Sequence, residues 1–523
     1  MQFDYDYIII GSGFGGSVSA LRLSQKGYRV LVLEKGKWWR AEDFAKNNWQ
    51  LRRWLWAPRL GMRGIFKMTF LNHITALSGV GVGGGSLTYA NTLPVPTDEF
   101  YRSGSWHTLA DWKEELAPYY DLSYRMLGAT THPYQGTADQ HLQRLARDLN
   151  IEHQCQATQV AVYFGEPGRQ VSDPYFAGRG PDRKGCIHCG ACMTGCRHHA
   201  KNTLDQNYLH LAQLEGAKIL AECEVTRVVP RDGNTGATGY NVVYKPHRKK
   251  EKSVTAKGIV FAGGVLGTVP LLLKLKSSSL PFLSDQIGRQ IRTNNEALIN
   301  VVSTDAQKGD FSKGIAIGSI VQTDADSHLE PTIYGKGSGF FKLLMVPWIP
   351  ERNKIKRLGL LVGTLFKHPI KWTRAFFAGD YASRSTYLLF MQTIDSTLRL
   401  RRGKITPLKT QHESGPAPSA FIPAVQPLVR KYEKQVKGMA FVGFTETLFG
   451  IPTTAHILGG AVMGASPEEG VIDKNNRVFG YQNMLICDGA MISANPGVNP
   501  SLTITAISER AMAQLPEKMR DKS

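Results

Sequence analysis

The first segment of the sequence constrains the fold more than any other. An apolar run from Tyr5 to Ile10 leads directly into the glycine turn GSGFGG. A stretch with helix-compatible spacing follows, and then a second apolar run that ends at Glu34. A strand, a glycine turn, a helix and a second strand in this order predict a βαβ unit of a parallel sheet.

The turn has the spacing G-x-G-x-x-G, formed by Gly11, Gly13 and Gly16. In such a turn the glycines allow a tight bend, a close approach of the backbone to a pyrophosphate, and close packing of the helix on the strand. An acid at the end of the second strand can accept a ribose hydroxyl, and Glu34 occupies that place. We therefore predict a dinucleotide site, since the alternative of a merely tight βα turn leaves Glu34 unexplained.

Five further segments follow the glycine turn in a characteristic order. They are SGVGVGGGSLTYAN (78–91), VFAGGVLGT (260–268), AHILGGAVMG (455–464), NMLICDGA (483–490) and GVNPSLTITAISERAM (497–512). Together these segments resemble the glucose-methanol-choline oxidoreductase family, most of all its cholesterol oxidase-like branch. The stretch 304–442 carries no motif that we identify with the family.

The resemblance implies FAD as the cofactor, because the family holds FAD with its first βαβ unit, its glycine-rich loop and its late strand ending in Asp-Gly. The residues that match these motifs are Gly11, Gly13, Gly16, Glu34, Gly83, Gly84, Ser86, Gly263, Asp488 and Gly489. Asn91 is a further candidate contact, although the run TYAN at 88–91 departs from the Val-Asn-Gly run of the branch.

The resemblance also implies two catalytic residues. His456 matches the family histidine before the Gly-Gly-x-x-x-Gly turn, and Asn499 matches the asparagine of the G-V-N-P motif. A histidine can take the hydroxyl proton, and a neutral amide can hold the substrate oxygen while hydride leaves carbon for the flavin. The alternatives are a histidine that is merely packed or exposed, and an asparagine that forms a turn before proline.

The motif positions predict an α/β fold made of a Rossmann-like FAD-binding domain and an inserted α+β substrate domain built on a β-sheet. We expect the FAD-binding domain to be discontinuous and to comprise residues 1–100, 200–300 and 455–523. The substrate domain is expected to comprise residues 101–199 and 301–454, with a cysteine-rich loop at 184–200.

That loop contains Cys186, Cys189, Cys192 and Cys196 in the pattern C-x2-C-x2-C-x3-C. The spacing is typical of bacterial ferredoxins, whereas zinc sites usually draw two C-x-x-C pairs from separated parts of a chain. Arg197 replaces the proline that usually follows the fourth cysteine. The spacing therefore does not decide between a three-iron and a four-iron cluster. We predict an iron-sulfur cluster, 3Fe-4S or 4Fe-4S, with zinc or a metal-free loop as alternatives.

The net charge of +20 is concentrated in part around residues 340–374, where eight Lys or Arg from 342 to 374 accompany one acid, Glu351. Aromatic and leucine side chains interleave with these cations, as in segments that lie on anionic membrane surfaces. We predict peripheral membrane contact through 340–374, with a simple cover over the substrate cavity as the alternative. No nucleic-acid-binding motif is present, so we do not expect a nucleic acid partner.

The sequence shows no secretory signal pattern and no run of about 18–20 apolar residues that could span a bilayer. We therefore expect a cytoplasmic protein, peripheral to the membrane at most. The expected activity is FAD-dependent oxidation of a hydroxyl group on a hydrophobic, sterol-like alcohol, with oxygen, a quinone or a redox protein as the electron acceptor. An electron-transfer flavoprotein and a flavin-containing steroid isomerase are the alternatives.

Overall fold

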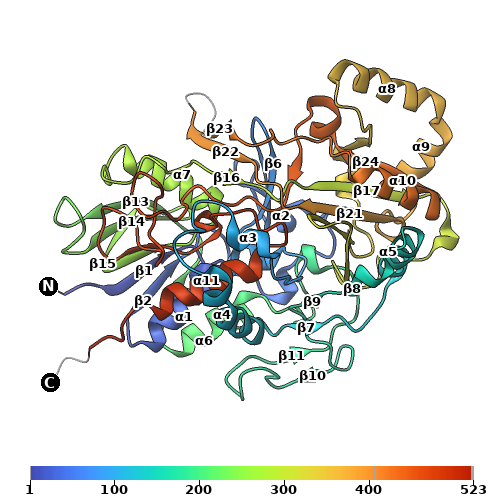
Figure 1. Ribbon diagram of the computed structural model, residues 1–523. Coiled ribbons are helices and arrows are strands. Elements are labelled where there is room, and N and C mark those ends of the chain that lie inside the picture. Colours follow the sequence, from blue (N-terminus) through green and yellow to red (C-terminus); the bar gives the residue numbers. More distant parts are fainter. Residues whose placement is uncertain (1, 404–407, 520–523) are drawn as a thin grey trace.

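The computed structural model describes residues 2–403 and 408–519. It has two large sheets that lie side by side, with helices packed on the outer faces (Figure 1). The predicted α/β class is confirmed. Among the described residues, no helix is both long enough and apolar enough to cross a membrane.

The first sheet carries the glycine turn and has the strand order β12-β2-β1-β15-β14-β13, with β26 paired to the end of β15. Its strands are β1 (Tyr5–Ile10), β2 (Val30–Leu33), β12 (Lys218–Leu220), β13 (Cys223–Pro230), β14 (Tyr240–Pro246), β15 (Lys252–Phe261) and β26 (Met484–Ile486). β12, β2, β1, β15 and β26 pair in parallel, whereas β13 and β14 are antiparallel. The carboxyl ends of the parallel strands therefore meet at one edge, which is where open α/β sheets bind ligands.

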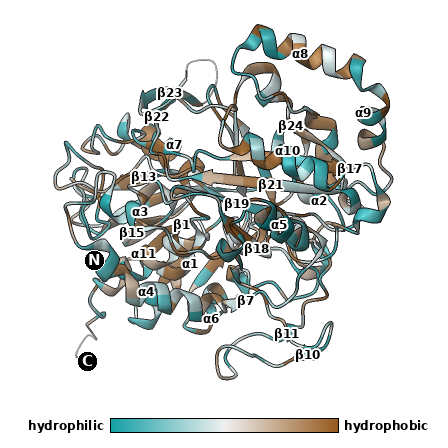
Figure 2. Ribbon diagram, turned by 45° about the vertical axis from the view of Figure 1, so that its right-hand side comes forward, coloured by the Kyte–Doolittle hydropathy of each residue, from teal (hydrophilic) through white to brown (hydrophobic). Residues whose placement is uncertain are grey.

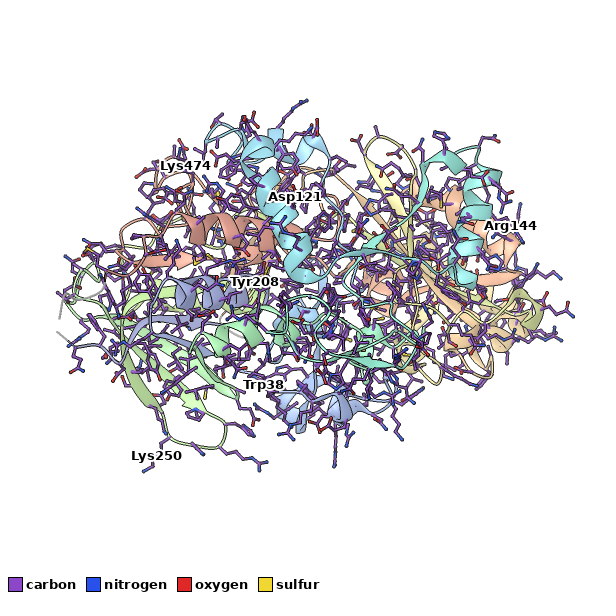
Figure 3. The ribbon with its side chains drawn as sticks, turned by 90° about the horizontal axis from the view of Figure 1, so that it is seen from below. Trp38, Asp121, Arg144, Tyr208, Lys250 and Lys474 are labelled. Atoms are coloured by element: carbon purple, nitrogen blue, oxygen red, sulfur yellow. The ribbon has the colours of Figure 1, made fainter. Side chains whose placement is uncertain are left out.

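Four helices gather on one side of this sheet: α1 (Phe14–Gln25), α4 (Trp112–Leu127), α6 (Tyr208–Leu214) and α11 (Ser501–Ala513) (Figure 1). A buried ion pair joins two of them, with Arg22 Nε 2.7 Å from Glu509 Oε2. Tyr208, labelled in Figure 3, donates its hydroxyl to the other oxygen of Glu509 at 2.6 Å. The C-terminal helix is thus fixed to the helix that follows the glycine turn.

The second sheet is wholly antiparallel and has the order β20-β24-β17-β21-β19-β18-β8. Its strands are β8 (Cys155–Ala157), β17 (Ala297–Ser303), β18 (Ser319–Gln322), β19 (Ser327–Thr332), β20 (Met345–Pro347), β21 (Ser385–Gln392) and β24 (Gly438–Gly443). Helices α5 (Thr137–Asp148) and α10 (Val425–Gln435) cover one face. Leu388 and Phe390 of β21 point into that core, while the alternate residues Tyr387 and Leu389 line a cavity on the other face.

Shorter elements connect the two sheets. The strands are β3 (Trp56–Ala57), β4 (Met62–Arg63), β5 (Phe66–Phe70), β6 (Thr75–Gly79), β7 (Thr130–Thr131), β9 (Gln159–Val160), β10 (Gln170–Val171), β11 (Arg183–Lys184), β16 (Ile291–Arg292), β22 (Thr397–Arg402), β23 (Leu408–Ser414) and β25 (Thr453–Thr454). The remaining α-helices are α2 (Leu51–Trp54), α3 (Asp98–Arg102), α7 (Val265–Lys276), α8 (Lys354–Lys367) and α9 (Pro369–Phe376). α8 and α9 project from the second sheet as a helical hairpin (Figures 1 and 2).

Close packing at the glycine turn predicts a strong effect of one methyl group. A Cβ added at Gly15 would lie 1.8 Å from the carbonyl oxygen of Cys487, at the end of β26. We expect Gly15→Ala to cost about 1–3 kcal/mol of folding free energy, because α1 must move away from the strand ends. Thermal unfolding of the FAD-loaded protein measures this cost as a lower Tm.

The matched control is Gly363→Ala in α8, where an added Cβ has nothing within 4 Å. This variant should match the parent or exceed its stability, by up to about 1 kcal/mol, since alanine favours a helix interior. Equal Tm values for the two variants would contradict the packing argument.

Candidate active site

A cavity of about 800 Å³ lies between the two sheets. Its first wall is formed by the glycine-rich turns that follow β1, β6 and β15, and its second wall by apolar side chains of the antiparallel sheet and of the segments beside it. The residues of the second wall include Leu298, Ile317, Tyr334, Phe341, Leu344, Met345, Tyr387 and Leu389. The cavity thus has one face of exposed backbone and one apolar face.

Nine predicted site residues line this cavity: Gly11, Gly13, Glu34, Gly84, Gly263, His456, Asp488, Gly489 and Asn499. The cavity wall does not include Gly16, Gly83, Ser86 or Asn91. Gly16 packs against the turn, where a Cβ would meet the carbonyl oxygen of Gly11 at 2.2 Å. Ser86 donates to the carbonyl of Gly83 and accepts from the amide of Leu204, so it shapes the glycine loop from behind.

The first wall fits a dinucleotide. A Cβ at Gly84 would lie 2.7 Å from Cα of Gly13, so two glycine turns approach each other more closely than side chains allow. Glu34 Oε2 accepts from the amide of Ser12 at 3.1 Å and from its hydroxyl at 2.8 Å, and Oε1 accepts from the amide of Gly36 at 2.8 Å. A carboxylate has about four acceptor positions, so Glu34 is held in place with capacity left for a ribose hydroxyl.

Asp488 is fixed by three donors. Its Oδ2 accepts from the Thr268 hydroxyl at 2.5 Å and the Gly264 amide at 2.9 Å, and its Oδ1 accepts from the Ala490 amide at 2.7 Å. Burial raises the pKa of Asp488 to about 6, against the effect of these hydrogen bonds. The contacts join the segments after β15 and β26 into one surface beside the cavity.

His456 is held by a glutamate that no sequence motif indicated. Glu296, immediately before β17, places Oε2 3.0 Å from Nδ1 of His456. Its Oε1 accepts from the Thr454 hydroxyl and from the amides of Ala455 at 3.1 Å and His456 at 3.2 Å. This contact fixes Nδ1 as the protonated nitrogen and leaves Nε2 as the basic nitrogen.

The two side chains shift each other's ionisation. Burial lowers the pKa of His456, but the negative charge and hydrogen bond of Glu296 outweigh burial and raise it above its ordinary value. Burial raises the pKa of Glu296, but the pairing with His456 and the further hydrogen bonds bring it below its ordinary value. Glu296 is therefore ionised at neutral pH, and it strengthens His456 as a base.

Asn499 lies at the turn that leads into α11. The preceding residues are tied to the second sheet, because Asn294 donates to the Val498 carbonyl at 2.8 Å and Asn495 donates to the carbonyls of Gln392 and Ile394. Within the described chain, the Asn499 side-chain oxygen is buried and has no hydrogen-bond partner. The amide therefore has unused hydrogen-bonding capacity beside the cavity.

The four clustered cysteines do not form a metal site in the described part of the chain. In residues 2–403 and 408–519, no group of three or more Cys, His, Asp or Glu side chains gathers closely enough to hold a metal ion. Cys186, Cys192 and Cys196 pack with the apolar side chains of Val160 and Ile315. The predicted iron-sulfur cluster thus has no support from the geometry, and iron and acid-labile sulfide analysis of anaerobically purified protein tests it directly.

Comparisons with known proteins agree with this site. Residues 6–309 match the family model described as FAD dependent oxidoreductase, and residues 429–508 match the GMC oxidoreductase model. The chain is 43% identical to a cholesterol oxidase from Acinetobacter baumannii, over 99% of this chain and 95% of the relative. This chain belongs to the GMC oxidoreductase family.

Two further comparisons place this GMC oxidoreductase in its family. A cholesterol oxidase from Mycobacterium tuberculosis is 42% identical over 99% of this chain and 92% of the relative. The crystal structure of pyridoxine 4-oxidase from Mesorbium loti shares the fold, with a TM-score of 0.64 at 14% identity and coverage of 97% and 98% of the two chains. The predictions of the family, of an FAD-dependent enzyme and of its cholesterol oxidase-like branch are confirmed.

Lys201 ties the cysteine-rich loop of this GMC oxidoreductase to its glycine-rich loop. Its buried Nζ donates to the carbonyls of Leu87 at 3.2 Å, Tyr89 at 2.8 Å and Cys192 at 2.9 Å. The ammonium also lies over the ring of Tyr89, 4.6 Å from its centre, and Tyr89 lines the cavity. No sequence motif indicated this role, because a single lysine after a cysteine motif has no distinctive context.

We expect Lys201→Met to loosen FAD and to lower stability by about 1–3 kcal/mol, because three buried carbonyls lose their donor. Release of FAD fluorescence on dilution, together with the Tm, measures the effect. Lys257→Met, at an exposed position of β15, is the matched control and should change neither quantity. Unchanged FAD retention in Lys201→Met would show that the cysteine-rich loop does not support the cofactor site.

Proposed function

We propose that this GMC oxidoreductase oxidises a hydroxyl group of a hydrophobic, sterol-like alcohol, with His456 as proton acceptor. The observation that carries the proposal is one cavity whose walls combine a surface suited to a dinucleotide, His456 with Glu296 paired behind it, and a broad apolar face. The cholesterol oxidases from Acinetobacter baumannii and Mycobacterium tuberculosis support a sterol-like substrate, because they align over nearly the whole chain.

Each group has a distinct part in this reaction. Gly11, Gly13, Glu34, Gly84 and Asp488 hold the cofactor, and Gly16, Gly83, Ser86, Asn91, Gly263 and Gly489 shape or complete its site. Bound FAD supplies a ring that accepts hydride from the carbinol carbon. His456 takes the hydroxyl proton at Nε2, Glu296 holds the ring in position, and Asn499 hydrogen-bonds the substrate oxygen.

The apolar wall has two effects on the reaction. It buries the body of a water-insoluble alcohol, and each fully buried apolar side chain gains about 1.5–3 kcal/mol relative to exposure. It also excludes water from the reacting atoms, which strengthens the electrostatic contacts of His456 and Asn499 with the substrate. The electron acceptor that follows is oxygen, a quinone or a redox protein.

The test is anaerobic flavin reduction by a panel of sterols, long-chain alcohols and sugars, followed by stopped-flow absorbance. A sterol should bleach the flavin of the parent protein, and His456→Ala should retain FAD but react about 10²- to 10⁴-fold more slowly. Bleaching by no alcohol would favour the electron-transfer alternative. Double-bond migration without bleaching would favour the isomerase alternative.

The pH dependence supplies an internal control for the role of His456. Because Glu296 raises the pKa of His456, the neutral base is lost as pH falls through that raised pKa, and flavin reduction should slow on the acid side. Glu296→Gln removes the charge, so its acid limb should move to lower pH while the maximal rate falls. An acid limb that stays in place would remove His456 as the titrating group.

We also propose that α8 and α9 dock this enzyme on anionic membranes. The sequence from 352 to 379 contains no Asp or Glu, and Figure 2 shows apolar and polar residues alternating on the projecting hairpin. Its exposed apolar side chains are Ile355, Leu360, Val362, Leu365, Phe366, Ile370 and Phe377. Its exposed cations are Lys354, Lys356, Lys367, Lys371 and Arg374.

Two cations of the basic segment are engaged within the protein. Arg357 is buried and donates to the carbonyls of Thr447 at 2.6 Å and Glu351 at 2.9 Å. The Lys342 ammonium lies near the ring of Phe376, 5.6 Å from its centre. The exposed cations of α8 and α9, and not every cation in 340–374, therefore supply the proposed attraction to lipid.

We expect Lys367→Glu with Lys371→Glu to weaken co-sedimentation with anionic vesicles at least tenfold at low salt, since each cation near the surface contributes about 1 kcal/mol. Lys249→Glu with Lys250→Glu makes the same charge change on the β14–β15 turn, at the other end of the molecule (Figure 1), and should have little effect. Equal losses in both variants would mean that net charge, and not the hairpin, directs binding.

A further inference from the structure

Glu446 is a buried carboxyl group at the cavity that the reaction described above does not use. It lies in a single π-helical turn, Thr445–Phe449, between β24 and β25. The side chain is 4% exposed, and Gly443, Phe444, Thr445 and Glu446 all line the cavity. Short π-helical turns occur often at functional sites, and carboxyl groups are seldom fully buried without a partner.

Two buried glutamates lie at or near the cavity in opposite surroundings, with Glu446 in its wall and Glu296 behind His456. Glu296 receives four hydrogen bonds, one of them from the ring of His456, as described above. Glu446 has an enclosed Oε1 with no partner anywhere in residues 2–403 or 408–519. Two carboxyl groups in unlike environments have different pKa values, so that one can be charged while the other is neutral.

Several groups decide the ionisation of Glu446. Burial raises its pKa to about 8, hydrogen bonds from Thr453 oppose the rise, and the negative charge of Glu296 adds to it. His456 does not neutralise Glu446, because its Nδ1 is paired with Glu296. Arg357, the cation of α8 that packs on this turn, donates to backbone carbonyls, including that of Thr447. Glu446 is therefore an uncharged acid with one O–H donor at neutral pH.

We propose that Glu446, as a neutral carboxylic acid, donates a hydrogen bond to the oxygen of the bound alcohol. The inference rests on the proposed function, since it needs a substrate oxygen beside His456. As the hydroxyl proton passes to Nε2 of His456 and hydride leaves the carbinol carbon for the flavin, negative charge develops on that oxygen. Glu446 keeps its own proton and stabilises this charge together with Asn499.

The geometry explains why the acid must remain neutral. An ionised Glu446 would place a second negative charge near Glu296 and would repel the charge developing on the substrate oxygen. Flavin reduction should therefore slow as pH rises through the pKa of Glu446. Lys67 also lines the cavity, and burial lowers its pKa to about 8, so an alkaline limb has two candidate sources.

The experiment separates these sources by measuring anaerobic flavin reduction from pH 6 to pH 10, at saturating sterol, in FAD-loaded protein. Glu446→Gln keeps an uncharged N–H donor, so it should retain the rate at pH 7 to within about tenfold and lose the alkaline limb. Lys67→Arg keeps its charge throughout this range, and its alkaline limb should match that of the parent. An alkaline limb that persists in Glu446→Gln overturns the proposal.

Two further variants keep the proposal testable if Glu446→Gln loses FAD. Thr453→Val removes a hydroxyl that lowers the pKa of Glu446, so its alkaline limb should move to higher pH. Glu446→Leu removes the donor and should slow flavin reduction about 10- to 100-fold at pH 7, where the parent acid is neutral. An unmoved limb in Thr453→Val, or an unchanged rate in Glu446→Leu, contradicts the role of Glu446. His456→Ala tests the proposed function separately, because its loss of rate does not depend on Glu446.

Discussion

The structure depends on close contacts between the backbones of its glycine turns, which leave no room for a side chain. A Cβ would lie 2.4 Å from the Ala262 carbonyl oxygen at Gly11, and 2.7 Å from Cα of Gly13 at Gly84. These contacts bring the turns after β1, β6 and β15 to one place, although Gly11 and Ala262 are 251 residues apart in the sequence. The surface they form is bare backbone, which is what a pyrophosphate needs in order to approach amide groups. The helices and the second sheet are arranged around that surface.

Residues in local motifs could be predicted from the sequence. Glu34 follows a glycine turn at a fixed distance, and His456 and Asn499 each lie inside a short run with its own spacing. In each motif the neighbouring residues indicate the strand, turn or helix in which the residue lies. All three residues line the same cavity in the structure.

Other features could not be predicted because they arise only when distant segments pack. Glu296 reaches His456 across 160 residues through the pairing of β17 with neighbouring elements. Glu446 has no distinctive sequence around it, and its neutral state depends on burial and on Glu296. The cysteines are the reverse case, because their motif is recognisable in the sequence but the predicted metal site is not formed by the described residues. A ferredoxin-like spacing does not determine where the side chains point. In the fold, three of these cysteines pack against apolar residues.

Arg357 connects two parts of the enzyme that otherwise have separate tasks. Its guanidinium joins α8, on the outside, to the carbonyl of Thr447, one residue beyond Glu446. A rigid contact of this kind transmits displacement, because a buried guanidinium cannot leave its carbonyl partners without a large desolvation cost. Through Arg357, α8 is therefore held against the turn whose residue Glu446 lines the cavity. A substitution of Arg357 would therefore disturb the outer hairpin and the cavity wall together, although the two lie on opposite sides of this contact.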